Sequence, residues 1–314
     1  MKPRVYLTRY IPKAIELLEK EFEVIVHKDK IPPDHTQLID NIKGVDALLC
    51  LPTDKIDKEV IDNAKNLKVI STYSVGYDHI DLDAAKKRGI IIGYTPDVLT
   101  DATADLTLAL LLAIARRVVE GDRLIRSNKW SREYDYYFML GRDLKDKILG
   151  IIGLGRIGLA VAKRAEAFGM KIIYYSKHKK DVNYEFTDLD DLLSKSDFTS
   201  LHVSLNKDTY HLINKDRLKA MKSTAYLINT ARGKIVDEEA LIRALKEHWI
   251  AGAALDVFEE EPLINSELIN LDNVVLTPHI GSATIETREK MAEIAAMNII
   301  NTFKGSKPIY QLNL

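Results

Sequence analysis

The chain has 314 residues, enough for two domains of ordinary size, and its 46% hydrophobic and 29% charged residues are typical of a globular protein. A formal net charge of −1 provides no basic field to hold nucleic acid or an anionic membrane, so neither is expected as a partner. The single cysteine, Cys50, excludes an intramolecular disulfide framework and a cysteine-based metal cluster, and it predicts a reducing, cytoplasmic location.

The first third of the chain alternates short β-like runs with helical runs. Strands are expected at 4–8, 23–27, 47–50, 69–72 and 90–93. Helices are expected between them at 12–21, 33–42, 57–63 and 81–88. This alternation predicts a parallel sheet with helices on both faces.

A Pro-marked segment, Tyr94-Thr-Pro-Asp97, then interrupts the pattern, and Thr100 or Asp101 can cap an apolar helix over 102–119. A second alternating series follows, with helices between most of its strands. Its strands are expected at 148–152, 171–175, 198–203, 225–229, 251–256 and 273–276. The tail, 284–304, is predicted as one amphipathic helix that returns to the first domain.

A glycine-rich turn, Gly153-Leu-Gly155-Arg-Ile-Gly158, follows the first strand of the second series and opens a helix. Gly153 permits a tight turn, Gly155 lets the backbone approach a pyrophosphate, and Gly158 lets the helix pack close to the sheet. The helix N-terminus adds N–H groups and a partial positive charge for the phosphates. This context favours a dinucleotide-binding turn over a purely structural one.

The whole pattern predicts an α/β protein of two doubly wound parallel-sheet domains. Residues 99–283 would form a Rossmann cofactor domain. This domain would be inserted into a discontinuous, flavodoxin-like substrate domain made of 1–98 and 284–314, with the active site in the cleft.

The segment after the second strand of this series bears on the choice of cofactor. NAD-binding units place an acidic residue there, on the ribose 2′-hydroxyl. This chain instead has Ser176 and a basic run that begins with Lys177 and His178 and ends at Lys180. A carboxylate would repel a 2′-phosphate, whereas a serine with basic neighbours can bind one. The segment predicts NADPH as the cofactor, with NADH as the alternative and a solvated loop without cofactor contact as the non-functional interpretation.

Three polar residues follow expected strand ends, where ligands of open α/β sheets bind. They are Arg232, Glu261 and His279. A histidine can protonate the carbonyl oxygen of a 2-oxo acid that receives a hydride at C2, and a carboxylate beside it favours the imidazolium. Arginine can hold a substrate carboxylate or the developing oxyanion. Each residue alone is weak evidence, but together they predict hydride transfer at C2 of a small 2-oxo acid.

Four motifs carry a resemblance to the D-isomer-specific 2-hydroxyacid dehydrogenase family along the whole chain. They are Gly153-Leu-Gly-Arg-Ile-Gly158, Asn229-Thr-Ala-Arg-Gly-Lys234, Ala254-Leu-Asp-Val-Phe-Glu259 through Glu261-Pro262, and Pro278-His-Ile-Gly-Ser-Ala283. Within that family, Ser71-Thr-Tyr-Ser-Val-Gly-Tyr-Asp78 and Gly93-Tyr-Thr-Pro-Asp-Val-Leu-Thr-Asp101 most resemble glyoxylate/hydroxypyruvate reductases. One departure is His202-Val-Ser204-Leu205, where the family often has His-x-Pro-Leu.

The resemblance implies a role for residues that the pattern alone leaves open. It implies that Arg232, Glu261 and His279 are catalytic, that the backbone amides of Val75 and Gly76 bind the substrate carboxylate, and that Leu51 lines the substrate pocket. The cofactor contacts that it implies are Thr103, Arg156, Ile157, Thr230, Ala231, Asp256 and Gly281. For Thr103 and Gly76, a helix-start residue and an ordinary loop glycine are the alternative interpretations.

Family members are dimers, so the resemblance also implies a homodimer, for which the apolar helix at 102–119 suits the interface. The aromatic run Tyr134-Asp-Tyr-Tyr-Phe138 is expected to pack on the partner subunit, with substrate contact as the alternative. D-3-phosphoglycerate dehydrogenase or another D-2-hydroxyacid dehydrogenase is a second enzymatic interpretation. A dinucleotide-sensing binding protein without turnover is a third, because such proteins retain similar polar residues.

Overall fold

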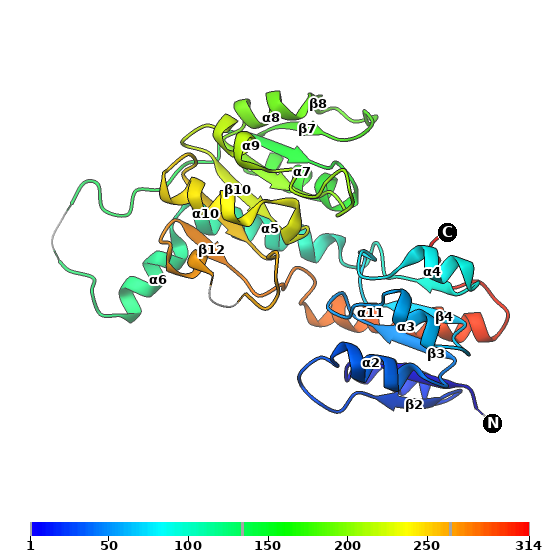
Figure 1. Ribbon diagram of the computed structural model, residues 1–314. Helices are drawn as coiled ribbons and strands as arrows, with labels where there is room; N and C mark the ends of the chain where they lie inside the picture. Colours follow the sequence, from blue (N-terminus) through cyan, green and yellow to red (C-terminus); the bar gives the residue numbers. More distant parts are fainter. Residues whose placement is uncertain (1, 133–134, 264–265, 314) are drawn as a thin grey trace. The chain divides into compact units, whose positions relative to one another are not determined.

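The computed structural model describes residues 2–132, 135–263 and 266–313 (Figure 1). The chain divides into two compact units, one of Met1–Leu99 with Ser282–Leu314 and one of Thr100–Gly281. From sequence the divisions were expected at 98/99 and 283/284. Within the described residues, none of the helices has both the length and the apolar character that crossing a membrane requires.

The first unit is built on a five-stranded parallel sheet in the order β2-β1-β3-β4-β5. This is the strand order of flavodoxin-like folds, which agrees with the expectation. Its strands are β1 (Arg4–Leu7), β2 (Glu23–Val26), β3 (Ala47–Cys50), β4 (Val69–Thr72) and β5 (Ile91–Gly93). Its helices are α1 (Pro12–Leu18), α2 (His35–Ile42), α3 (Lys58–Asn63), α4 (Leu82–Lys87) and α11 (Ile285–Phe303).

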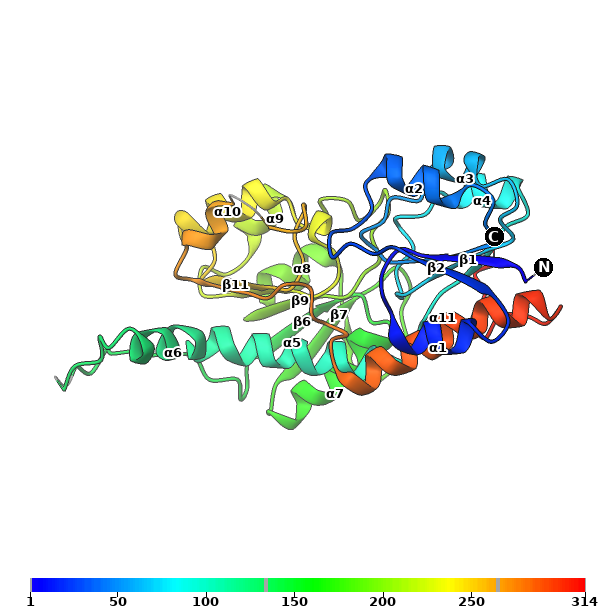
Figure 2. The same cartoon turned by 90° about the horizontal axis from the view of Figure 1, so that it is seen from below.

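The helices of this unit cover both faces of the sheet. Helices α2, α3 and α4 pack side by side on one face, and α1 packs against α11 on the other (Figure 2). Asp34, Asp57 and Asp81 precede α2, α3 and α4, and each accepts a hydrogen bond from the backbone amide three residues on. These caps fix the point at which each helix begins after its connecting loop. Helix α11, from the tail of the chain, also contacts the strand β4 of this sheet.

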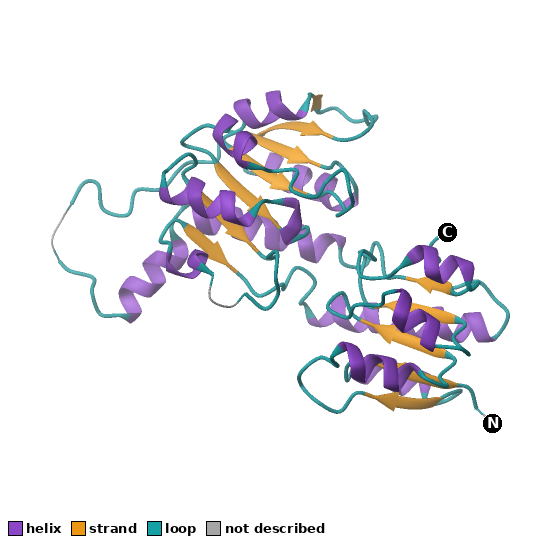
Figure 3. Cartoon of the chain, in the orientation of Figure 1, coloured by secondary structure: helices purple, strands orange, loops and turns teal. Residues whose placement is uncertain are grey.

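The second unit is built on a seven-stranded parallel sheet in the order β12-β11-β10-β9-β6-β7-β8. Figure 3 draws the strands of both sheets as orange arrows and the helices that cover them in purple. Counted within the unit, this is the Rossmann order 3-2-1-4-5-6 with a further edge strand. Its strands are β6 (Ile148–Ile152), β7 (Lys171–Tyr175), β8 (Glu185–Phe186), β9 (Phe198–Leu201), β10 (Tyr226–Asn229), β11 (Gly252–Leu255) and β12 (Val274–Leu276).

Helices again cover both faces of the sheet, and each face has its own hydrophobic cluster. Helices α5 and α7 lie over one cluster, and α8, α9 and α10 lie over the other. The α-helices of the unit are α5 (Thr100–Ala115), α6 (Val118–Arg126), α7 (Arg156–Ala167), α8 (Leu189–Lys195), α9 (Lys215–Ala220) and α10 (Glu238–Lys246). Two short 3₁₀ helices, Gly233–Ile235 and Glu267–Asn270, complete it.

The helix expected at 102–119 is wrong at both ends. Helix α5 already begins at Thr100, so Thr100 and Asp101 lie in its first turn instead of capping it. It ends at Ala115 because Arg117 adopts a left-handed backbone with a φ of 52°, and the chain resumes as α6. The edge strand β8 was not expected, since two residues are too few to show a periodic pattern. The other strands and helices are confirmed, with ends displaced by a few residues.

Candidate active site

The glycine turn joins β6 to α7, next to the point where the strand order of the seven-stranded sheet reverses. Gly153 has a φ of +98°, and a Cβ there would lie 2.6 Å from the carbonyl oxygen of His202. A Cβ on Gly158 would lie 2.2 Å from the carbonyl oxygen of Gly153, whereas a Cβ on Gly155 would meet no protein atom within 4 Å. The fold therefore requires glycine at 153 and 158, whereas Gly155 leaves its backbone open to a ligand.

Helix α7 begins at Arg156 with no side chain capping its first turn, because its N-cap residue is Gly155. Unsatisfied amides and the positive end of the helix dipole favour an anion at such a position. The open space beside Gly155 and the uncapped helix start together fit the pyrophosphate of a dinucleotide. Arg156 and Ile157 are the first two residues of the helix.

The basic segment lies beside this turn, because the amide of Gly153 donates a 2.8 Å hydrogen bond to the carbonyl oxygen of Tyr175 at the end of β7. Ser176 Oγ donates to the carbonyl oxygen of His178 at 2.9 Å. Lys177 and His178 are exposed, as are the lysines that follow them. This basic segment therefore lies at the end of β7, on the solvent side of the glycine turn.

His279 and Glu261 are brought together from two different loops. His279 Nδ1 lies 2.6 Å from Glu261 Oε2, and Glu261 Oε1 accepts a hydrogen bond from the amide of Phe258 at 3.1 Å. Burial opposes ionisation of Glu261, but hydrogen bonds from His279 and Phe258 and the charge of Arg232 outweigh it, so the pKa of Glu261 lies below its ordinary value. A charged Glu261 orients the imidazole with Nε2 left for another partner.

The loop that carries His279 is braced by the buried Asp256, at the end of β11. Asp256 Oδ1 accepts hydrogen bonds from Thr277 Oγ1 at 2.6 Å and from the amide of Ile280 at 2.8 Å. Its Oδ2 accepts from the amide of Gly281 at 2.8 Å, and its carbonyl oxygen accepts from the amide of His279 at 2.9 Å. Burial raises the pKa of Asp256, against the effect of these hydrogen bonds. The sequence suggested a cofactor contact for Asp256, and it did not reveal this bracing role.

Arg232 follows β10 in a turn that Asn229 stabilises. Asn229 Oδ1 accepts from the amide of Ala231 at 3.0 Å, and its Nδ2 donates to the carbonyl oxygen of Arg232 at 2.9 Å. A Cβ on the next residue, Gly233, would lie 1.8 Å from the carbonyl carbon of Phe258. The Arg232 turn and the loop that leads to Glu261 are therefore in close backbone contact. Asn229 and Gly233 were missed as site residues, although a strand-end Asn before Thr-Ala-Arg-Gly is a recognisable turn signal.

The remaining cofactor candidates lie at the same carboxyl edge or beside it. Thr103 Oγ1 donates to the carbonyl oxygen of Gly281 at 3.2 Å, and the hydroxyls of Thr107 and Thr230 are 2.9 Å apart. Burial lowers the pKa of His202 to about 3, and its Nε2 lies 2.8 Å from Ser200 Oγ. His202 is therefore neutral at physiological pH and contacts its own strand.

Of the four candidates for substrate binding, Arg232 belongs to the second unit, and the other three, Leu51, Val75 and Gly76, belong to the first. Leu51 follows β3, and its amide donates to the buried Asp54 at 2.8 Å. Val75 and Gly76 follow β4 and are half-buried. Among the hydrogen bonds of the described residues, none uses the amide of Val75 or Gly76 as donor.

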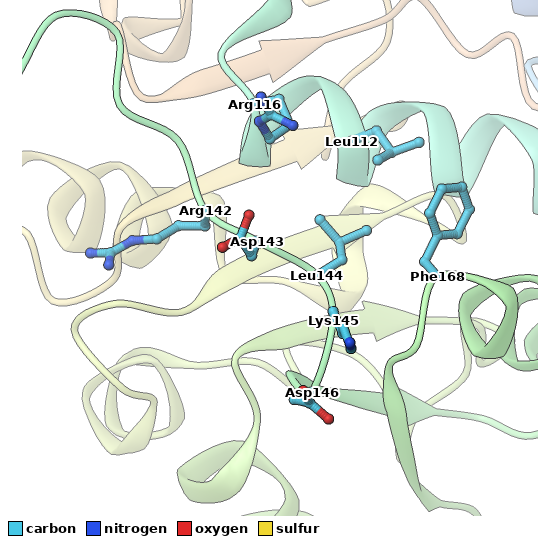
Figure 4. Close-up of a pocket in the computed structure, with 8 residues that line it drawn as sticks. All are labelled: Leu112, Arg116, Arg142, Asp143, Leu144, Lys145, Asp146 and Phe168. Atoms are coloured by element: carbon cyan, nitrogen blue, oxygen red, sulfur yellow. The ribbon is translucent and has the colours of Figure 1, made fainter.

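One surface hollow of the second unit, about 590 Å³ in volume, is unrelated to these residues (Figure 4). Its lining residues are Leu112, Arg116, Arg142, Asp143, Leu144, Lys145, Asp146 and Phe168. Lys145 and Asp146 lead into β6 and Phe168 leads into β7, so the hollow lies at the amino edge of the sheet. The polar residues described above follow the carboxyl ends of the strands, where ligands of open α/β sheets bind.

Comparison with known proteins agrees with the fold and the motifs. Residues 108–281 match the D-isomer specific 2-hydroxyacid dehydrogenase, NAD binding domain, family. A glyoxylate reductase of Thermofilum pendens is 58% identical, with 98% of this chain and 93% of that protein covered. A glyoxylate reductase of Pyrococcus horikoshii is 55% identical, with 98% and 95% covered. The chain therefore belongs to the D-isomer-specific 2-hydroxyacid dehydrogenase family and is an NAD(P)-dependent oxidoreductase.

Solved structures show the same architecture over the whole chain. A protein from Thermus thermophilus superposes with a TM-score of 0.93 at 49% identity, with 99% of this chain and all of that chain covered. The NADPH-dependent glyoxylate/hydroxypyruvate reductase of Sinorhizobium meliloti, in complex with NADP and malonate, superposes with a TM-score of 0.91 at 32% identity, with 99% and 97% covered. The predicted fold class, two parallel-sheet domains with a Rossmann cofactor domain, is confirmed.

Proposed function

We propose that this protein reduces glyoxylate, hydroxypyruvate or both to the 2-hydroxy acid with NADPH, and that His279 acts as the general acid. The observation that carries the proposal is the 2.6 Å pair of His279 and Glu261, in the same unit as Arg232 and a dinucleotide-type glycine turn. The names of the similar proteins, glyoxylate reductase and glyoxylate/hydroxypyruvate reductase, support this substrate class.

In the proposed reaction the residues of this chain orient the substrate and supply a proton. When bound, the reduced nicotinamide supplies a hydride to C2 of the 2-oxo acid. His279 donates its Nε2 proton to the C2 oxygen, while Glu261 accepts from Nδ1 and stabilises the imidazolium. Arg232 holds the substrate carboxylate or the developing oxyanion through its guanidinium fork. In the reverse direction the neutral imidazole accepts the proton.

Two amides of the first unit are proposed to bind the substrate carboxylate. Val75 and Gly76 are consecutive residues of the loop after β4, and successive backbone N–H groups can form a concave anion site. Leu51 is proposed as an apolar neighbour of the substrate.

The preference for NADPH over NADH is proposed from the segment after β7. Ser176, Lys177 and His178 stand where NAD-binding units have an acidic residue, and the hydrogen bond between Gly153 and Tyr175 holds them beside the glycine turn. An NADP complex of a similar reductase is consistent with this choice. The contacts of Thr103, Thr230, Ala231, Asp256 and Gly281 to the cofactor, and the location of the protein in the cytoplasm, stay predictions.

A substrate panel tests the proposal directly. Glyoxylate, hydroxypyruvate and 3-phosphohydroxypyruvate would each be offered with NADPH and with NADH, and turnover followed at the absorbance of the reduced nicotinamide. We expect the highest kcat/KM for glyoxylate or hydroxypyruvate with NADPH. A higher value for the phosphorylated acid would identify a phosphoglycerate dehydrogenase instead, and a higher value with NADH would contradict the cofactor assignment.

A further inference from the structure

A chain of side-chain hydrogen bonds lies behind the loop that carries Val75 and Gly76. Ser74 Oγ donates to the carbonyl oxygen of Gly76 at 2.5 Å. The hydroxyls of Ser74 and Thr72 are 2.8 Å apart, and Thr72 Oγ1 lies 3.1 Å from His79 Nε2. If His79 donates to Thr72, Thr72 donates to Ser74 and Ser74 donates to the carbonyl oxygen of Gly76, each of the two hydroxyls donates one hydrogen bond and accepts one.

The two hydroxyls of this chain are shielded from solvent, so their mutual hydrogen bond is not exchanged freely for bonds to water. Thr72 is fully buried and Ser74 is 6% exposed. Cys50 Sγ, also fully buried, lies 3.8 Å from His79 Nε2. In such surroundings a missing partner leaves a polar group unsatisfied, which typically costs about 1–3 kcal/mol. The position of the Gly76 carbonyl is therefore strongly determined by the Ser74 hydroxyl.

Peptide planarity transmits this constraint to the loop amides. The carbonyl oxygen of Ser74 accepts from the amide of Thr95 at 2.8 Å, so the amide of Val75, on the opposite side of the same peptide, points away from Thr95. The carbonyl oxygen of Gly76 is turned toward Ser74 Oγ. The amide of Gly76 lies between these two fixed peptides. Ser74 thus holds both ends of the Val75–Gly76 segment, one through its backbone and one through its hydroxyl.

We propose that Ser74 is a positioning residue for the substrate carboxylate, and that the hydrogen-bond chain of His79, Thr72 and Ser74 sets the orientation of the Val75 and Gly76 amides. This inference rests on the proposed function, in which those amides bind the carboxylate. The hydroxyl does not touch the reacting atoms. Its effect is on binding of the acid, and it leaves the proton donor and the cofactor site of the other unit unchanged.

The test is Ser74→Ala, compared with the wild type in glyoxylate reduction. Loss of the hydroxyl should raise the KM for glyoxylate about tenfold, the change that corresponds to about 1.4 kcal/mol. The kcat at saturating glyoxylate and the KM for NADPH should change less than about twofold. Thr72→Val, which removes the donor to Ser74, should raise the KM for glyoxylate by a smaller factor. Ser74→Thr keeps a hydroxyl at this position, so its KM for glyoxylate should stay at the wild-type value.

Ser71→Ala is the matched control, because Ser71 is a fully buried serine of β4, next to Thr72, and its hydroxyl contacts Asn298 and not the loop. It should leave the KM for glyoxylate unchanged. An unchanged KM in Ser74→Ala, an equal rise in Ser71→Ala, or a parallel loss of kcat and NADPH binding would each overturn the positioning role.

Inhibition by oxalate separates this inference from the proposed function. Oxalate offers a carboxylate with no reducible carbonyl, and its Ki can be measured against any 2-oxo acid that the enzyme turns over. A Ki raised about tenfold in Ser74→Ala supports the positioning role whichever 2-oxo acid is the substrate. If the wild type reduces neither glyoxylate nor hydroxypyruvate, the proposed function fails, whereas an unchanged Ki with normal glyoxylate turnover overturns the positioning role alone.

Discussion

At the scale of single residues, the proton transfer that we propose depends on one contact, between His279 and Glu261. The contact joins side chains from loops 18 residues apart in sequence, and it leaves Nε2 as the ring nitrogen that can reach a substrate. Glu261 stays ionised because the hydrogen bonds and the positive charge around it outweigh its burial. In the proposed reaction His279 therefore carries the proton for the substrate, and Glu261 keeps its negative charge.

Removal of the imidazole gives the first prediction. His279→Ala should lower kcat by about 10²–10⁴, the usual contribution of a positioned general acid, and leave the KM for NADPH unchanged. Steady-state kinetics with saturating NADPH measure both. His248→Ala, at an exposed histidine after α10, is the control. A near-normal kcat in His279→Ala would contradict the assignment of the acid.

The charge of Glu261 gives a prediction on pH dependence. Glu261→Gln keeps a hydrogen-bond acceptor for Nδ1 but removes the negative charge that favours the imidazolium. A glutamine does not titrate, so the fall in kcat/KM at acid pH that accompanies protonation of Glu261 in the wild type should be absent from the variant. In the wild type the pKa of Glu261 is lowered, so its negative charge is lost only as the pH falls below the ordinary range of a glutamate. A pH profile of kcat/KM that does not move would exclude a role for this charge.

At the scale of elements, loops at the carboxyl ends of strands carry every candidate side chain of the second unit that we propose for the chemistry. The basic segment follows β7, and a backbone hydrogen bond from Gly153 to Tyr175 places it beside the glycine turn. The loop after β10 meets the loop after β11 at Gly233, where only a hydrogen atom fits. Both contacts depend on neighbouring strands being in register.

The basic segment gives the third prediction. Lys177→Ala combined with His178→Ala should raise the KM for NADPH about tenfold or more and leave the KM for NADH nearly unchanged, since only NADPH carries the 2′-phosphate. Ser176→Asp should shift the preference toward NADH by repulsion of that phosphate. Lys195→Ala, at an exposed lysine of α8, is the control. Equal effects on both cofactors would show that the segment does not read the 2′-phosphate.

Two glycines that differ in their surroundings give the fourth prediction. Gly155→Ala places a methyl group in space that no protein atom occupies, so the melting temperature should hold while NADPH binding weakens. Gly233→Ala would drive a methyl group into the Phe258 carbonyl, so it should destabilise the protein by about 1–3 kcal/mol and lower kcat by displacing the loop that holds Glu261. Thermal denaturation and NADPH titration distinguish the two. The reverse order of effects would contradict these assignments.

At the scale of the whole molecule, the second unit exposes a group of apolar side chains along α6 and the segment after it. They are Val118, Ile125, Trp130, Tyr136, Tyr137, Phe138 and Leu140. Tyr134, which was expected to belong to the same aromatic run, lies outside the described residues. No residue of α6 is buried, although the helix is amphipathic. A surface of this kind is typical of a protein–protein interface.

The fifth prediction follows from this surface and from the expectation of a homodimer. Ile125→Glu combined with Tyr137→Glu should convert a dimer to a monomer, measured by light scattering during size-exclusion chromatography. Ile31→Glu is the control, because Ile31 lies in the other unit and is about as exposed as Tyr137, so the measured mass of the particle should stay that of the wild type. A monomeric wild type would rule out the homodimer.

The sequence by itself determined the class of fold and the type of chemistry. Alternating apolar runs are local patterns, so the parallel sheets, the glycine turn and the return of the tail helix were all predictable. The strand-end positions of Arg232, Glu261 and His279 were predictable for the same reason. The end of α5 was not, because the left-handed residue Arg117 carries no glycine signal.

Only the tertiary structure decided which groups meet. The bracing of the His279 loop by Asp256, the backbone contact at Gly233 and the hydroxyl chain from Thr72 to Gly76 join residues whose partners depend on strand register and loop path. Such contacts follow from three-dimensional packing, which no periodicity in the sequence encodes. The residues that we propose to act on substrate and cofactor were therefore visible in the sequence, whereas the residues that hold them in place were not.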